Sequence, residues 1–100
     1  MMTFEEFTDS VKTRDAPPDG LADALSALWW QRKGEWQKAH EIVLGKSIEE
    51  VSWVHAHLHR EEGDLGNAEY WYTRAGRRAA KGDLNEEWEE LVRALLEIYT

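Results

Sequence analysis

The sequence predicts an all-α fold of about five helices, built on two short helical hairpins with flanking helices. Apolar residues recur at spacings of three and four along almost the whole chain, which is the period of an amphipathic helix. Valine, isoleucine and threonine are sparse and never alternate with polar residues, so no segment is typical of a strand. With 100 residues, 42% hydrophobic and 32% charged, the chain is expected to form one globular domain.

The first helix is predicted over residues 3–14, followed by a linker over residues 15–20. Thr3 and Glu6 have the spacing of a capping box, and a short apolar stripe follows them. Two adjacent prolines break the chain in the linker, because proline cannot donate a backbone hydrogen bond. Since this is the only linker-like segment, we expect the first element to be either a packed helix or a loosely packed arm.

The first hairpin is predicted over residues 21–45. Its first helix carries apolar residues on more than one face, so it requires neighbours on more than one side. Gly34 follows two basic residues, which is a common way for a helix to end. A second helix, with Trp36 and Ala39 facing inward, then runs to Gly45.

The second hairpin is predicted over residues 47–76, with Ser47 and Glu50 in capping-box spacing at its start. Gly63 ends its first helix. The inward face of its second helix is predicted to comprise Leu65, Ala68, Tyr72 and Ala75. After a basic, alanine-rich connection, a long amphipathic helix is predicted over residues 83–100.

The two hairpin turns, residues 34–39 and 63–68, share one layout. Each has a glycine, an acid and a large apolar residue, followed three positions later by an alanine. Glycine turns the chain tightly, the acid favours the positive end of the next helix, and alanine lets two backbones approach. This pattern resembles the tetratricopeptide repeat, although the two units are 29 residues apart rather than ~34.

Ala27 and Ala56 also occupy positions where the tetratricopeptide family has a small residue. The resemblance covers residues 21–76 and implies a short right-handed stack of two hairpins. In such a stack, the first and last helices cap the exposed ends.

A narrower resemblance rests on the run from Trp53 to Tyr72. With variable positions written as x, this run is WVHAxLHRxEGDxxNAxYWY. It resembles a family of small uncharacterised bacterial proteins, and this resemblance implies no activity.

The chain is acidic, with a formal net charge of −8 from 20 acids and 12 bases. This charge repels nucleic acid and anionic membranes, so we expect neither as a partner, whereas a polypeptide partner is compatible with it. The absence of cysteine excludes thiol catalysis and thiolate metal sites. No signal peptide and no apolar run of ~20 residues is apparent, so a cytoplasmic location is expected.

Three alternating histidines, His55, His57 and His59, raise the question of a metal site. On a helix only His55 and His59 share a face, so a third ligand such as His40 or Glu62 is needed. The segment also lacks the glutamate that directly follows the first histidine in the zinc-helix motif. We therefore expect a packed or hydrogen-bonded histidine pair, with no metal and no cofactor.

A polar-aromatic stripe is predicted on the second helix of the second hairpin, away from its inward face. The stripe consists of Asn67, Tyr70, Trp71 and Arg74. If it is exposed, it offers side chains that are enriched at binding hot spots, and His59, Arg60 and Asp64 could extend it. The favoured alternative is that the final helix covers the stripe, which makes Tyr70 and Trp71 core residues.

The leading functional expectation is a non-enzymatic module that binds a polypeptide through its helical surface. No nucleophile motif or glycine-rich phosphate loop supports catalysis. The second hypothesis is a small-ligand or metal site, with or without enzymatic activity, centred on His55, His59 and Arg74. A third is a homo-oligomer formed through the final helix.

Overall fold

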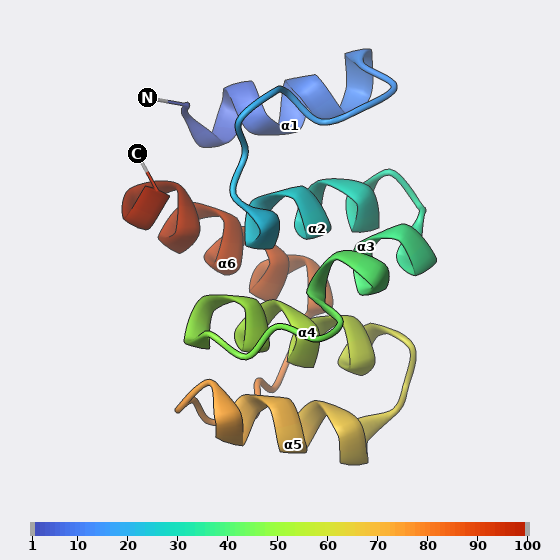
Figure 1. Cartoon of the computed structure of the whole chain (residues 1–100), viewed down its shortest axis with the longest axis vertical. Helices are drawn as coiled ribbons and strands as arrows, with labels where there is room; N and C mark the ends of the chain where they lie inside the picture. The colour runs from blue at the N-terminus through green and yellow to red at the C-terminus, as the bar shows by residue number, and fades with distance from the viewer. Residues whose placement is uncertain (1, 100) are drawn as a thin grey trace.

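The computed structural model describes residues 2–99, and these residues form six α-helices and no strand, which confirms the all-α prediction. In chain order the helices are α1 (Phe4–Thr13), α2 (Asp23–Arg32), α3 (Trp36–Val43), α4 (Glu49–Glu61), α5 (Leu65–Arg74) and α6 (Leu84–Tyr99). Helices α1, α2, α4 and α5 follow one another along the long axis, with α3 on one side and α6 on the other (Figure 1). No helix among the described residues is long and apolar enough to cross a membrane.

Helices α2 and α3 form one hairpin, and α4 and α5 form the other. Their tight turns contain Gly34 and Gly63, whose φ angles of 90° and 87° lie in the left-handed region that glycine tolerates best. In the second turn, the carboxylate of Asp64 accepts a hydrogen bond from the backbone N–H of Asn67 and caps α5. Both predicted turns are therefore present.

Helix α4 is the central element of the fold. Every residue from Val51 to His59 is buried, because α2, α3, α5 and α6 all pack against this helix. Helix α6 lies against α1, α2 and α4, and the indole N–H of Trp88 donates to the carbonyl of Leu28 at 3.1 Å. The core thus runs along α4 and is closed on one side by α6.

Helix α1 is a packed part of the domain rather than a loose arm. Phe7 is fully buried, and its ring lies 5.9 Å from that of Trp88. The indole N–H of Trp29 donates to the hydroxyl of Ser10 at 2.9 Å, which ties α2 to α1. The predicted capping box of Thr3 and Glu6 is present at the start of this helix.

Two details of the predicted helix ends and faces were wrong. Leu65 was expected to face inward but is 66% exposed, because it lies in the first turn of α5, beside the end of α4. The expected cap at Ser47 does not form; Ile48 is the N-cap of α4 and provides no side-chain hydrogen bond.

A buried charge cluster joins α4, α5 and α6. The carboxylate of Glu87, 5% exposed, accepts hydrogen bonds from Nδ1 of His57 at 2.6 Å, from Arg60 at 2.9 Å and from the hydroxyl of Tyr72. Burial acts to raise the pKa of Glu87, but the hydrogen bonds from His57, Tyr72 and Arg60 outweigh burial and hold it below its ordinary value. Burial and the neighbouring carboxylate raise the pKa of Tyr72. Glu87 is therefore a buried anion that three helices share.

Candidate metal centre

Three histidines from two helices meet on the side of α4 that faces α3. His40 comes from α3, and His55 and His59 lie one turn apart on α4. One ring nitrogen of each histidine lies within 4.8 Å of the corresponding nitrogens of the other two. The closest pair is Nε2 of His40 and Nε2 of His55, which are 3.1 Å apart.

These separations suit a shared metal ion. Zinc binds imidazole nitrogen at ~2.0–2.1 Å, and tetrahedral angles then place two ligand nitrogens ~3.3 Å apart. The distance between His40 and His55 is already close to this value. The nitrogen of His59 lies within 4.8 Å of both.

The ring of His59 is oriented by a carboxylate. Its Nδ1 lies 2.7 Å from Oε1 of Glu62, so the N–H at this position donates to the carboxylate and Nε2 remains free to bind a metal. Metal-binding histidines commonly have such a carboxylate behind the ring. His57, in contrast, points to Glu87 on the opposite side of α4, as the helical period predicts.

Burial favours the metal-binding form of His40 and His55. Burial, followed by the proximity of His59 and His40, lowers the pKa of His55 to about 4. The pKa of His40 is also lowered, mainly by burial and then by His59, although Glu62 and Glu41 oppose the shift. Because neutral imidazole is the form that binds metals, both rings are ready to coordinate at neutral pH.

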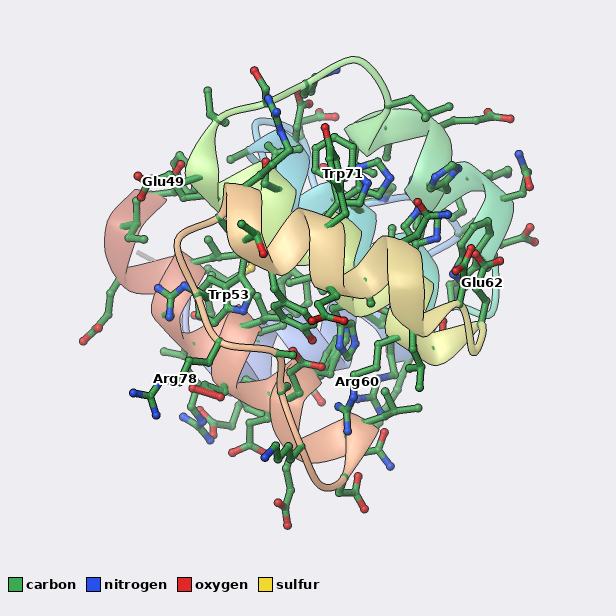
Figure 2. All side chains as sticks on the ribbon, turned by 90° about the horizontal axis from the view of Figure 1, so that it is seen from below. Glu49, Trp53, Arg60, Glu62, Trp71 and Arg78 are labelled. Atoms are coloured by element: carbon green, nitrogen blue, oxygen red, sulfur yellow. The ribbon has the colours of Figure 1, made fainter. Side chains whose placement is uncertain are left out.

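Two tryptophans hold the rings in place. Trp36 stacks on His40 with ring centroids 4.7 Å apart, and its indole N–H donates to the carbonyl of Leu58 at 2.8 Å. Trp71 stacks on His55 at 4.0 Å. Figure 2 shows Trp71 on the side of α5 that faces α3, whereas Trp53 and Arg60 lie on the opposite side, toward α6. The cluster is thus walled by aromatic rings from α3 and α5.

The predicted site residues fall into three places. His55 and His59 belong to the histidine cluster, whereas Arg60 belongs to the cluster around Glu87. The α5 stripe contains the remaining predicted residues, Asn67, Tyr70, Trp71 and Arg74.

Helix α6 does not cover the α5 stripe, so the favoured alternative was wrong. Tyr70 is 54% exposed, Asn67 and Arg74 are exposed, and Trp71 is half-buried against His55. The Arg74 guanidinium lies 5.5 Å from the Trp71 ring and can donate to the hydroxyl of Tyr70 at 3.4 Å. Arg74 therefore lies over the aromatic wall rather than among the histidines.

Sequence reasoning named His40 only as one of two possible third ligands, and it missed Trp36. The two residues are four positions apart on one helix, so they share a face, and this spacing is a signal that was available. No protein-family model matches the chain, and no curated protein or solved structure matches it significantly.

Proposed function

We propose that this protein binds a divalent transition-metal ion, with zinc as the first choice, through His40, His55 and His59. The observation that carries the proposal is the convergence of three imidazole nitrogens within 4.8 Å of one another. The proposal departs from the sequence-based expectation of a packed histidine pair without a metal.

The hydrogen bonding of the cluster favours a metal over simple packing. His55 is 2% exposed, and its Nε2 has the Nε2 of His40 as its hydrogen-bond partner, at 3.1 Å. An ion among the three rings replaces this single hydrogen bond with a stronger partner that all three rings share.

The donor set determines the class of metal. Imidazole suits zinc, copper, nickel and cobalt, whereas magnesium and calcium prefer oxygen donors. The chain has no cysteine, so a thiolate site is excluded. Three neutral nitrogen ligands therefore favour a first-row divalent ion.

In this proposal the ion links two tetratricopeptide-like hairpins. Ala39 and Ala68 are buried where each hairpin closes, and Ala27 and Ala56 are buried in the preceding helices, as the family pattern implies. His40 comes from the first hairpin, while His55 and His59 come from the second. The ion thus connects the two hairpins at their junction, and α1 and α6 act as the capping helices.

Calorimetric titration of metal-free protein with zinc tests the proposal. We expect one ion per chain. Of the three ligands, His55 and His59 are buried and His40 is partly exposed, so His40→Ala is the substitution that disturbs the core least. Gln37→Ala, at an exposed position on the same helix, is the matched control.

Loss of a carboxylate behind a ligand costs about 10–100-fold in metal affinity, so we expect loss of a ligand to cost more. The control is expected to bind as the wild type does. The absence of zinc binding by the wild type, or equal affinity of His40→Ala and wild type, contradicts the proposal.

The exposed α5 stripe supports a second candidate function, the binding of a polypeptide. Tyr70 and Arg74 lie side by side in solvent, and such side chains are enriched at binding hot spots. Tyr70→Ala leaves the wall residue Trp71 in place, so it tests the surface without disturbing the histidines. Identical partners for wild type and variant in pull-downs from the native host contradict this candidate.

A further inference from the structure

Among the described residues, the histidine cluster has three histidine ligands and no fourth histidine or carboxylate ligand. Within the described residues, the donor groups close enough to share an ion are His40, His55 and His59, and a second set of His59, Glu62 and Asp64. Only His59 is common to both. An ion placed among the three histidines therefore lacks a carboxylate from the second set.

Glu62 is not positioned to be the fourth ligand. It is bonded to Nδ1 of His59, and the two nitrogens of an imidazole point away from each other. A carboxylate bonded to Nδ1 therefore lies across the ring from an ion on Nε2. Glu62 orients the ligand instead of binding the metal.

Asp64 is also occupied. Its carboxylate accepts from the backbone N–H of Asn67 at 3.2 Å and from the side-chain amide of Asn67 at 2.7 Å. These bonds form the cap of α5, and they lower the pKa of Asp64. Moving this carboxylate to the histidines breaks the cap.

The two residues that stack on the cluster, Trp36 and Trp71, bring no ligand atom. The indole N–H of Trp36 already donates to the carbonyl of Leu58, and indole nitrogen is a donor only.

His40 is half-buried, whereas His55 and His59 are buried, so solvent reaches the cluster at His40. This partly exposed edge of His40 is where a molecule from solution can approach an ion.

We propose that the ion keeps an exchangeable fourth position that takes a small anion in place of water. This inference rests on the proposed metal binding. Three neutral imidazoles bring no negative charge into the coordination shell of the ion, so a monodentate anion is favoured over a neutral donor at the fourth position. Sites with three protein ligands and an open position differ in this way from structural sites, which are closed by four.

Cobalt and azide provide the test. Cobalt(II) replaces zinc in sites of this type, and its visible absorption reports the number and kind of its ligands. We expect the protein to acquire a cobalt spectrum and azide to shift that spectrum in a saturable way. Thiocyanate is expected to compete with azide for the same position.

A matched variant distinguishes the possible outcomes. Glu62→Gln removes an exposed carboxylate and leaves the three ligands in place, so it is expected to bind cobalt more weakly but to respond to azide. A cobalt spectrum that azide does not change in the wild type overturns the open position, and an azide response seen only in Glu62→Gln identifies Glu62 as the fourth ligand. The absence of any cobalt spectrum overturns the metal site itself.

Discussion

Replacement of Glu87 by glutamine tests whether the buried charge cluster holds α6 against the rest of the domain. The Glu87 side chain is 4% exposed and that of Arg60 is 13% exposed, so the two charges interact largely out of water. Glutamine has nearly the same shape, so the substitution removes the charge without leaving a cavity. Arg60 then remains as a largely buried cation without its counter-charge.

The contacts of Glu87 set the loss of unfolding free energy that we expect from Glu87→Gln. Removing one partner of a buried ion pair typically destabilises a protein by about 3–5 kcal/mol. Glutamine keeps one acceptor oxygen, and its amide can donate to the hydroxyl of Tyr72, so we expect the lower end, about 3 kcal/mol. For a domain of this size, with a urea m value of about 1.5 kcal/mol/M, this loss lowers the unfolding midpoint by about 2 M urea.

Urea unfolding followed by tryptophan fluorescence measures this cost. The matched control is Glu89→Gln on the same helix, whose surface pair with Arg93 is half exposed and is expected to contribute less than about 1 kcal/mol. If the free energy of unfolding of Glu87→Gln lies within about 1 kcal/mol of that of the wild type, the cluster does not stabilise the packing of α6 and the reasoning is refuted.

The same network and fold give four further predictions. Because the folded-state pKa of Glu87 is depressed, its contribution to the free energy of unfolding is present above the ordinary glutamate pKa and is lost as pH falls through the folded value. The loss of unfolding free energy caused by Glu87→Gln should therefore shrink at low pH. An unchanged loss at low pH argues against this. Free zinc at 100 times its Kd should stabilise the protein by about 2.7 kcal/mol and raise its Tm by about 10–20 °C. His40→Ala should abolish this shift in Tm. An equal shift in the wild type and in His40→Ala contradicts the metal site. Phe7→Ala should cost about 3–5 kcal/mol in urea unfolding, whereas a cost below about 1 kcal/mol indicates that α1 is a loose arm after all. Gly63→Ala should destabilise the protein by about 1–2 kcal/mol because the φ angle of Gly63 is 87°. Gly66→Ala, inside α5 with open space around it, should stabilise the protein by about 0.5–1 kcal/mol. If both variants change the stability in the same direction, the turn geometry is refuted.

The helices could be predicted because their signals are local. Gly34 and Gly63 end helices through their own backbone freedom, and apolar residues at helical spacing identify the buried faces. Leu65 was misassigned because the pattern does not reveal where the neighbouring helix ends. Ser47 was misassigned because capping-box spacing permits a cap but does not ensure that one forms.

The candidate site could be predicted only in part, because its geometry is tertiary. His55 and His59 share a face by helical period alone, so the sequence identifies them as a pair. His40 reaches them because α3 packs against α4; its spacing from Trp36 places it on the inward face of its helix but does not show which helix that face meets. The partnership of His57 with Glu87 depends in the same way on where α6 lies, 30 residues further along the chain.

The exposure of the α5 stripe also depends on the position of one helix. A long amphipathic helix at the end of the chain was expected to cover Tyr70 and Trp71. Instead α6 packs against α1, α2 and α4, where Trp88 reaches the carbonyl of Leu28. Periodicity shows that α6 has an apolar face, but it does not select the surface on which that face packs.

X-ray absorption of the zinc-loaded protein tests the central claim most directly, because it reports the atoms around the ion. We expect three nitrogen ligands at ~2.0–2.1 Å with the scattering pattern of imidazole rings, and one further light atom. In His40→Ala one imidazole contribution is expected to be lost. A shell composed of oxygen atoms without imidazole scattering, or a wild-type spectrum that His40→Ala leaves unchanged, contradicts the account.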